Sequence, residues 1–334
     1  MNIEVVGGGS LGLLLAGSLA AADTGASLTL VVRTLRQAEA ISALGITVKD
    51  KDGNHPRTAA AACLDFAAYS DGQRRSQGGA DWILLALKQK DIGPSIIEAI
   101  RRRAGQHTRI CCLQNGMGHL EKLRAATGTD RLYAAVTTEG AMRVSDTEVW
   151  HTGTGSTRIG AAEEEADPSG THAALLAEIL GHAGLQAVAS GNIQADIWDK
   201  LIINTVINPL TALLEVRNGR LLDDAHSIEL MRRLFEEAES AAAAAGYGRT
   251  AGIRWQKLVE VCRATAGNRS SMLQDLTGGR HTELDWLTGA LLREAERYGL
   301  KLPHHETVYR LVKAKEALRA GNEEGMDMSK IFLS

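Results

Sequence analysis

The chain has 334 residues, which is long enough for two domains. Hydrophobic residues make up 44% and charged residues 23% of it, the proportions of an ordinary water-soluble globular protein. The formal net charge of −3 excludes a global electrostatic attraction to nucleic acid or to an anionic membrane, so we expect neither as a partner.

The first half of the chain alternates predicted strands with predicted helices. A short apolar strand at 2–6 leads through glycines to an Ala- and Leu-rich helix at 11–22 and a second strand at 27–32, which together form a βαβ unit. The other elements expected here are a hairpin or strand pair at 46–50 and 57–63, strands at 82–86 and 109–113, a helix near 94–103, strand-like segments at 132–138 and 148–160, a helix at 171–183 and a strand at 185–189. This alternation predicts the α/β class with a parallel, doubly wound sheet.

Two polar segments interrupt this pattern, and its character changes near residue 190. Residues 70–79 are rich in glycine and predict an exposed loop, and the acidic residues 162–170 predict a solvated turn. After Asn192 only helical patterns remain, at 194–214, 224–245, 250–266, 281–298 and 304–320. We therefore predict an α/β domain over 1–190, an all-helical domain over 191–322 and a flexible tail over 323–334.

A glycine-rich motif, Gly7-Gly8-Gly9-Ser10-Leu11-Gly12, follows the first predicted strand and opens the first predicted helix. In such a motif the first glycine permits a tight turn, the second admits a pyrophosphate, and the third lets helix and strand pack closely. The positive end of the helix then faces the negative charge. Because the strand and the helix are both present, we predict a dinucleotide-binding loop rather than a purely structural glycine turn.

The residue at the end of the second strand indicates which dinucleotide is bound. NAD sites usually carry an acidic residue there, which binds the ribose 2′-hydroxyl. This chain has Arg33 instead, and an arginine suits the 2′-phosphate of NADPH, which an acid would repel. Arg36 is more simply interpreted as a solvated charge. Lys88 and Asn115 follow two later strands, at the sheet edge where ligands of open α/β sheets collect.

The helical stretch around Lys200 combines an apolar surface with a ribbon of polar side chains. Side chains four apart lie nearly above one another on a helix, so Lys200, Asn204 and Asn208 form one polar ribbon, whereas Leu201, Ile202, Ile203, Val206 and Ile207 cover the other faces. Burial lowers the pKa of a lysine from about 10.4 toward neutrality, which makes Lys200 a candidate proton donor. The alternative is a lysine that reaches the surface, two capping amides and a kink at Pro209.

A second polar cluster, at 268–285, favours the catalytic interpretation. Ser270 and Ser271 could cap a helix or bind a carboxylate. Glu283 stands at the start of the predicted helix 281–298, where capping is the simplest role, but a carboxylate near a buried ammonium would also stabilise it. His281 is as readily a capping residue at the surface as a chemical one.

The cysteines and the N-terminus indicate a cytoplasmic protein. Cys63, Cys111, Cys112 and Cys262 match no zinc-binding spacing, and we predict buried reduced thiols and no metal site. The chain begins directly with a strand, without a basic region or a cleavage site, so we expect no signal peptide.

The chain resembles the ketopantoate reductase (2-dehydropantoate 2-reductase) family over nearly its whole length. The matching segments are GGGSLG at 7–12, the strand-end Arg33, LALK ending at Lys88, QNGMG at 114–118, IWDKLIINTVINPLTAL at 197–213, RNG at 217–219, NRSSMLQD at 268–275 and RHTELDW at 280–286. The resemblance implies a Rossmann-type domain followed by a helical domain of the 6-phosphogluconate dehydrogenase C-terminal type, with the active site in the cleft between them. It also implies NADPH-dependent reduction of 2-dehydropantoate, a small 2-oxo acid, to (R)-pantoate in the pathway to pantothenate and coenzyme A.

The resemblance also implies roles for single residues. Lys200 matches the family's proton donor to the C2 ketone oxygen. The positions that match substrate contacts are Asn115, Asn204, Asn208, Asn218 and Ser271. The positions that match cofactor contacts are Gly7, Gly8, Gly9, Ser10, Leu11, Gly12, Arg33, Lys88, Asn115, Ala141 and Glu283.

Some alternatives stay open at this stage. The loop at 66–79 is longer than the family usually carries, although it touches no site motif. Reductases of other 2-oxo acids share the fold, so another 2-oxo acid remains possible as substrate. A β-hydroxyacid dehydrogenase would typically read GLGxMG in the glycine loop, and a non-catalytic NADPH sensor would not need Lys200, Asn115 and Glu283 together. The helical domain could support a homodimer, although no apolar stripe stands out as surplus.

Overall fold

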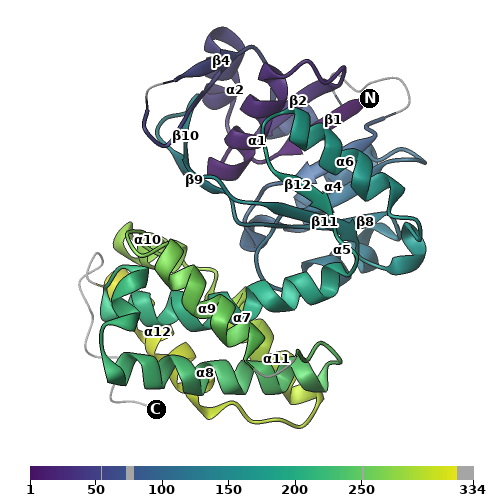
Figure 1. Cartoon of the computed structure of the whole chain (residues 1–334). Coiled ribbons are helices and arrows are strands. Elements are labelled where there is room, and N and C mark those ends of the chain that lie inside the picture. Colours follow the sequence, from purple (N-terminus) through teal and green to yellow (C-terminus); the bar gives the residue numbers. More distant parts are fainter. Residues whose placement is uncertain (54, 73–78, 250–251, 322–334) are drawn as a thin grey trace, which may run out of the picture. The chain divides into compact units, whose positions relative to one another are not determined.

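The structure is a computed structural model, and it describes residues 1–53, 55–72, 79–249 and 252–321. The chain divides into two compact units, the first ending at Asp196 and the second beginning at Ile197. Figure 1 shows that the first contains sheets and helices and that the second contains helices alone. The boundary that we predicted near residue 190 precedes the observed boundary by a few residues. The predicted tail at 323–334 lies outside the described residues.

The larger sheet of the first unit carries the predicted βαβ elements. Its strands are β1 (Asn2–Val6), β2 (Ser27–Val32), β5 (Ala62–Asp65), β6 (Trp82–Leu85), β7 (Arg109–Cys112), β8 (Leu132–Thr137), β11 (Thr157–Ala161) and β12 (Ala187–Ala189). Within the described residues they run in the order β12-β11-β8-β7-β6-β1-β2-β5. The strands from β5 to β8 are parallel, as predicted. The prediction of a parallel sheet is wrong for β11 and β12. Strand β11 pairs antiparallel with β8, and β12 pairs parallel with β11, so both run opposite to the other strands.

A smaller sheet was not predicted. It contains β4 (Arg57–Ala59), β3 (Ile46–Lys49), β10 (Glu148–Gly153) and β9 (Gly140–Arg143), in that spatial order among the described residues. The hairpin expected at 46–63 is therefore only half right, since β4 pairs with β3 but the residues after it leave as β5 for the larger sheet. The partner of β3 is β10, about a hundred positions along the chain, which no local pattern can indicate.

The helices of the first unit cover both faces of the larger sheet. They are α1 (Ser10–Ala21), α2 (Leu35–Leu44), α3 (Phe66–Ser70), α4 (Pro94–Arg103), α5 (His119–Thr127) and α6 (Thr171–His182), with the 3₁₀ turns η1 (Gln89–Asp91) and η2 (Glu164–Ala166). Helices α2, α3 and α5 were not predicted. Helix α3 lies in the stretch taken as a long loop at 66–79, of which residues 73–78 are outside the described part.

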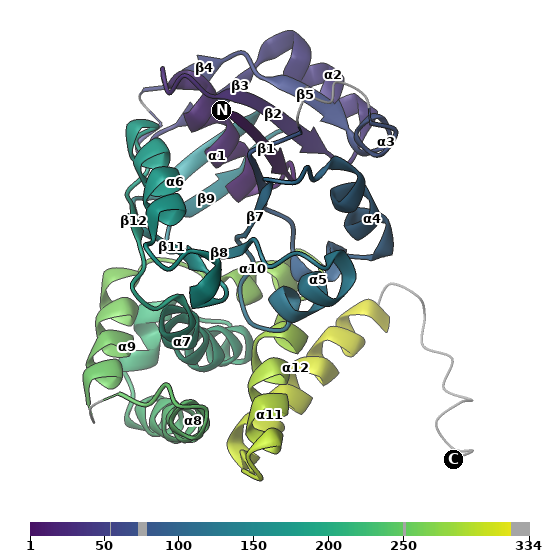
Figure 2. The same ribbon diagram turned by 90° about the vertical axis from the view of Figure 1, so that its right-hand side faces the viewer.

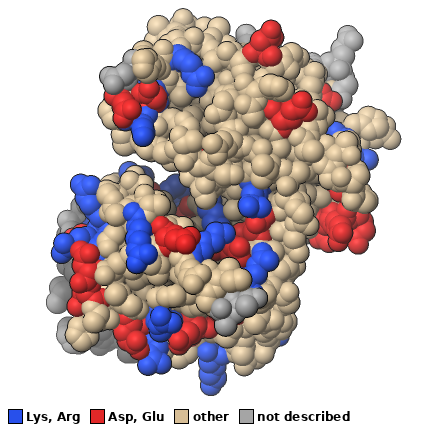
Figure 3. Space-filling model, viewed as in Figure 1, with Lys and Arg blue, Asp and Glu red and all other residues tan. Residues whose placement is uncertain are grey.

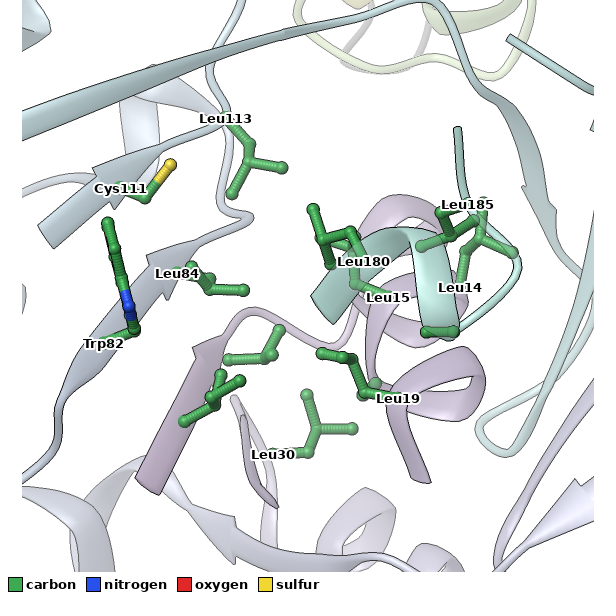
Figure 4. Close-up of a cluster of buried hydrophobic side chains, with 14 of the residues drawn as sticks. Leu14, Leu15, Leu19, Leu30, Trp82, Leu84, Cys111, Leu113, Leu180 and Leu185 are labelled. Atoms are coloured by element: carbon green, nitrogen blue, oxygen red, sulfur yellow. The ribbon is translucent and has the colours of Figure 1, made fainter. Parts of the chain in front are cut away.

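Helix α1 is apolar on every side because both sheets pack against it. All of residues 12–19 are buried, and strands of the small sheet contact α1 opposite the larger one. A Cβ added at Gly17 would come within 2.8 Å of a methyl group of Ile46, so glycine is what lets β3 approach the helix. Figure 4 shows Leu15 and Leu19 of α1 in the same core as Leu84 of β6 and Leu180 of α6.

The opposite face of the larger sheet holds a buried ion pair. Ile3 and Val5 of β1 point into the α1 core, so the residue between them, Glu4, points the other way. There its carboxylate pairs with Arg103, the last residue of α4, and accepts a hydrogen bond of 2.9 Å from the Tyr69 hydroxyl of α3. The Arg103 guanidinium also lies over the Tyr69 ring, 4.6 Å from its centroid. All three side chains are buried, so this network fixes α3 and α4 on the central strand.

The predicted thiols are confirmed as buried residues. Cys63, Cys111, Cys112 and Cys262 all lie in the interior. Burial raises the pKa of the Cys111 thiol well above its ordinary value and that of Cys262 to about 11. Thiols held in this way are unreactive at neutral pH.

The second unit is built from helices, as predicted. Its elements are α7 (Ile193–Leu214), which begins four residues before the boundary, η3 (Asn218–Leu222), α8 (Ala225–Ala244), α9 (Ile253–Ala264), α10 (Ser271–Thr277), η4 (Leu284–Trp286), α11 (Thr288–Arg297) and α12 (Pro303–Gly321). A buried arginine of α9, Arg254, pairs with Asp199 of α7 at 2.6 Å and with Glu239 of α8 at 2.8 Å. This pair of contacts holds the three helices together; Figure 2 gives a second view of α7, α8 and α9.

One predicted helix of the second unit begins later than expected. The pattern at 281–298 predicted a continuous helix, but only Thr288–Arg297 is α-helical. Leu287, with φ −101° and ψ −90°, interrupts the helical path between η4 and α11. Glu283 therefore does not cap a long helix, and Thr282 instead accepts a hydrogen bond of 3.2 Å from the Leu284 amide. Helix α10, in contrast, was not predicted at all.

The surface carries mixed charge. On the face shown in Figure 3, basic and acidic side chains are interspersed on the second unit. Many are partners on one helix, such as Arg233 and Glu229 of α8 at 2.8 Å. No helix in the described part of the chain combines the length and the apolar character that crossing a membrane requires.

Candidate functional site

The turn from β1 to α1 admits only glycine at Gly7 and Gly12. Gly7 has φ +127°, and a Cβ there would lie 2.7 Å from the carbonyl oxygen of Ala86 in the loop after β6. A Cβ at Gly12 would collide with the carbonyl oxygen of Gly7. The Gly7 amide donates to the Val31 carbonyl at 2.8 Å, which holds the turn against β2. The loop is therefore drawn tightly over the carboxyl ends of these strands.

Gly8 and Gly9 differ in what surrounds them. A Cβ at Gly8 would lie 2.6 Å from a methyl carbon of Val32 and 2.8 Å from the side-chain amide of Gln37. A Cβ at Gly9 would meet no protein atom within 4 Å. Gly9 also precedes α1 as its N-cap and makes no side-chain capping hydrogen bond, so it leaves the first N–H groups of that helix without a side-chain cap. An open glycine beside the positive end of a helix is the arrangement that binds a pyrophosphate.

The loops after β6 and β7 lie beside this turn, because β1, β6 and β7 are parallel neighbours. Lys88 precedes η1 and Asn115 follows β7, and both side chains are half-buried. Two buried glutamines join the loops: Gln114 donates to the Leu87 carbonyl at 2.9 Å, and Gln89 donates to the Asn115 carbonyl at 2.6 Å. Neither glutamine was predicted as a functional residue, although Gln114 begins the QNGMG segment.

Arg33 lies at the end of β2 with 77% of its side chain exposed, and it pairs with Asp91 of η1 at 3.2 Å. Arg36, in the first turn of α2, is equally exposed but pairs with Asp146 at 2.8 Å. Ala141, on β9, is half-buried against the core that surrounds α1. The exposed guanidinium of Arg33 is thus open to an anionic ligand at the strand end where the sequence analysis expected one.

Helix α7 carries the predicted polar ribbon. Of its apolar flank, Leu201, Ile202, Val206 and Ile207 are buried as predicted, whereas Ile203 is half-buried. On the ribbon itself, Lys200 and Asn204 are half-buried and Asn208 is buried. The helix continues through Pro209 to Leu214. Lys200 and Asn204 are therefore partly shielded from solvent but still accessible to a ligand.

Lys200 has an altered pKa and an acidic neighbour. Burial of the ammonium lowers the pKa of Lys200 to about 8, and the charge of Glu283 acts in the opposite direction. Glu283 is itself only 8% exposed. The family resemblance implies a cofactor contact for Glu283, and in the structure its charge acts on Lys200. An ammonium with a pKa near 8 is a much better acid at neutral pH than an ordinary lysine.

The remaining predicted substrate residues, Asn218 and Ser271, also lie in the second unit. The buried Asn218 begins η3, its amide donates to the Asn268 carbonyl at 3.0 Å, and its Nδ2 donates to Thr265 at 2.9 Å. Its Oδ1 is buried and has no hydrogen-bond partner among the described residues. An amide oxygen in that state can accept a hydrogen bond from a ligand hydroxyl.

The two adjacent serines divide the roles that the sequence left open. Ser270 is buried and caps α10, accepting from the Leu273 amide at 3.1 Å and from the Thr211 hydroxyl of α7 at 2.7 Å. Ser271 is the first residue of α10 and is exposed. The capping role therefore belongs to Ser270, and Ser271 keeps its hydroxyl available for a ligand.

The structure thus groups the predicted residues in two sets. The glycine loop, Arg33, Lys88 and Asn115 share one edge of the larger sheet in the first unit. Lys200 and Glu283 interact within the helical unit.

Comparison with known families matches both units. Residues 3–164 match the family described as ketopantoate reductase PanE/ApbA, and residues 192–316 match the C-terminal part of the same family. The 2-dehydropantoate 2-reductase of Bacillus subtilis is 35% identical over 319 residues, which cover 95% of this chain and 98% of that protein. The enzyme of the same name from Yersinia pestis is 37% identical over 71% of this chain and 75% of its own length.

Solved structures agree with this assignment. A probable 2-dehydropantoate 2-reductase from Bacillus subtilis superposes with a TM-score of 0.77 at 33% identity, over 94% of this chain and all of that one. A D-mandelate dehydrogenase in complex with NADH and anilino(oxo)acetate superposes with a TM-score of 0.84 over 96% of this chain and 99% of its own, but at 22% identity it indicates the fold alone. With both units matched and a relative similar from end to end, the chain belongs to the ketopantoate reductase family.

Proposed function

We propose that this protein is an oxidoreductase that uses NADPH to reduce 2-dehydropantoate to (R)-pantoate, the step that supplies pantoate for pantothenate and coenzyme A. Family membership supports the reaction, since relatives named 2-dehydropantoate 2-reductase match the chain at 35–37% identity. The observation that carries the proposal is Lys200, a proton donor with a pKa near 8 on a ribbon of amides.

The residues present fit a nicotinamide dinucleotide. The open space at Gly9 and the uncapped start of α1 suit the pyrophosphate, and Arg33 suits a 2′-phosphate. Lys88 and Asn115, from the joined loops after β6 and β7, would contact the rest of the cofactor. Bound NADPH supplies the hydride that the C2 ketone accepts.

The protein's own residues would then complete the reduction. Lys200 donates a proton to the oxygen of the former ketone, which needs the ammonium form at the start of the step. Glu283 keeps that form populated, because its negative charge raises the pKa that burial lowers. The amides of Asn204, Asn208 and Asn218 with the Ser271 hydroxyl would hold the substrate carboxylate and 4-hydroxyl.

Removing the charge of Glu283 is expected to move the pH dependence of kcat. In the wild type, kcat should fall as the pH rises through the Lys200 pKa near 8, since the ammonium is lost. In Glu283→Gln only burial acts on Lys200, so its pKa falls further and the alkaline decline should begin roughly one pH unit lower. The measurement is kcat against pH at saturating NADPH. Glu283→Asp should keep the wild-type limb, and an unshifted limb in Glu283→Gln would remove Glu283 from this role.

Arg33 is expected to determine the preference for NADPH. Replacing it by alanine removes a charge-assisted hydrogen bond to the 2′-phosphate, so the KM for NADPH should rise about tenfold or more. The KM for NADH should stay unchanged, because NADH has no phosphate there. Steady-state kinetics with both cofactors measures the two values. Equal use of NADPH and NADH by the unmodified protein would contradict the assignment.

The simplest test of the proposed function is direct. Purified protein is expected to oxidise NADPH when ketopantoate is supplied and to form (R)-pantoate in equal amount. Stoichiometric NADPH binding without turnover on any 2-oxo acid would instead indicate a sensor.

A further inference from the structure

The carbonyl oxygen of Gly8 is fixed by two side chains from different parts of the first unit. Gln37, in the first turn of α2, donates to it from Nε2 at 3.0 Å. Arg143, the last residue of β9 in the small sheet, donates to it from Nη1 at 3.1 Å. Gln37 is buried, and its Nε2 also donates to the Asp146 carbonyl at 3.1 Å. The glycine loop, α2 and the turn after β9 are thereby joined at one atom.

Arg143 is held in place from four directions. Its Nε donates to the Ser145 carbonyl at 2.9 Å, and its Nη2 pairs with the carboxylate of Asp146. Its backbone amide donates to the Ser10 hydroxyl at 3.0 Å, at the first residue of α1. Together with the bond to Gly8, these contacts fix the planar guanidinium on the glycine loop, although Arg143 lies at the surface with 36% of its side chain exposed.

Fixing the Gly8 carbonyl also fixes the amide of Gly9. The two groups belong to one planar trans peptide, in which the C=O and the N–H point in opposite directions. Because Gln37 and Arg143 hold the oxygen on the protein side, the Gly9 N–H must point away from them. Among the glycines of this loop, Gly9 is the one at which a Cβ would meet no protein atom within 4 Å. The clamp therefore aims one N–H into the space proposed for the pyrophosphate.

We propose that Arg143 is a positioning residue for the cofactor. It acts from the small sheet by clamping the Gly8 carbonyl, so that the glycine loop is already in its binding conformation before the dinucleotide arrives. The inference rests on the proposed use of a nicotinamide dinucleotide. Through Arg143, the small sheet would thus contribute to cofactor binding at this edge of the larger sheet. Because the pyrophosphate is common to both cofactors, Arg143 acts on NADPH and NADH alike, unlike Arg33.

The test compares cofactor affinities in Arg143→Ala with those in the wild type. Titration without any 2-oxo acid gives the Kd of NADPH and of NADH. Arg143→Ala should raise both by the same factor, about tenfold, because only about a tenth of the free molecules would then hold the glycine loop in its binding conformation. At saturating NADPH, kcat and the KM for the 2-oxo acid should stay within about twofold of wild type, which general structural damage would not allow. Arg101→Ala, an exposed arginine paired with Glu98 on α4, serves as the matched control with unchanged affinities.

Two results would overturn the proposal. Unchanged Kd values in Arg143→Ala would show that the loop needs no clamp. A rise in Kd for NADPH but not for NADH would mean that Arg143 binds the 2′-phosphate instead of positioning the loop. Arg143→Lys separates position from charge, since lysine keeps the charge but lacks the planar fork. It should stay closer to Arg143→Ala than to wild type, and full recovery would reduce the role to charge alone.

Gln37→Met provides an independent variant if Arg143→Ala folds poorly. Methionine is close in size but cannot donate to Gly8, so both Kd values should again rise together. In the double variant the rise in Kd should be smaller than the product of the two single-variant rises, because both side chains act on the same oxygen. A rise equal to that product would mean that the two side chains act separately. These titrations contain no substrate, so they remain decisive even if ketopantoate proves not to be the substrate.

Discussion

Replacing Lys200 with alanine is expected to lower kcat for the reduction of ketopantoate by a factor on the order of 10²–10⁴. The proton for the nascent alkoxide would then have to come from water, which is a far weaker acid than an ammonium with a pKa near 8. The Kd of NADPH should stay near the wild-type value, because the glycine loop and Arg33 lie in the other unit of the chain. Stopped-flow or steady-state kinetics, combined with NADPH titration, measures both quantities.

Two controls make this result specific. Lys257 of α9 is half exposed and pairs with Asp199 beside Lys200, so Lys257→Ala removes a nearby lysine without removing the proton donor. Its kcat should stay within about twofold of wild type. Lys200→Arg keeps a positive charge, but a guanidinium does not release a proton near neutral pH, so its kcat should be nearly as low as that of Lys200→Ala. An unchanged kcat in Lys200→Ala would end the assignment of Lys200.

Replacing Arg103 with methionine is expected to lower the free energy of unfolding of the first unit by about 3–5 kcal/mol. The guanidinium is buried against the Glu4 carboxylate, so its loss leaves a buried negative charge with the Tyr69 hydroxyl as its remaining donor in this network. Denaturant unfolding followed by a probe in the first unit measures the change. A loss below about 1 kcal/mol would mean that water reaches Glu4 in the variant.

The neighbouring residue and a double variant test the cause. Arg102→Met removes an exposed arginine that pairs with Glu98 at 3.0 Å, and such surface pairs contribute at most about 1 kcal/mol. Glu4→Gln combined with Arg103→Met leaves no buried charge, so it should be more stable than Arg103→Met alone. A double variant as unstable as the single one would indicate lost packing around Tyr69 instead.

Local patterns in the sequence predicted the parts of the site that depend on local geometry. The GxGxxG motif lies between β1 and α1 as predicted, because a strand, a glycine turn and an apolar helix are adjacent in sequence. The polar ribbon of α7 follows from helical spacing alone. For the same reason the helical character of the second unit was predictable from its repeating apolar positions.

What the sequence did not reveal depends on contacts between distant residues. Glu4 sits in an apolar strand, and its partners Tyr69 and Arg103 are 65 and 99 positions away. Arg143 reaches Gly8 across 135 positions, from a small sheet whose pairing of β10 with β3 is also long-range. Neither residue belongs to a recognisable local pattern, so only the folded chain indicates a role.

Glu283 illustrates an intermediate case. Its position before an apolar pattern predicted a helix-capping role, and the carboxylate was also weighed as a partner for a buried ammonium. The backbone break at Leu287 removes the first role. The interaction with Lys200 supports the second. The sequence therefore contained the relevant residue but could not decide between a local and a long-range partner.

We predict that the site discriminates ketopantoate from other 2-oxo acids. The most direct measurement is NADPH oxidation with ketopantoate beside a panel of other 2-oxo acids, giving kcat/KM for each. We predict a value for ketopantoate at least about a hundredfold above the others, or about 2.7 kcal/mol of transition-state discrimination. Higher kcat/KM for another 2-oxo acid, with little or no turnover of ketopantoate, would contradict the claim and assign the same Lys200 chemistry to a different substrate.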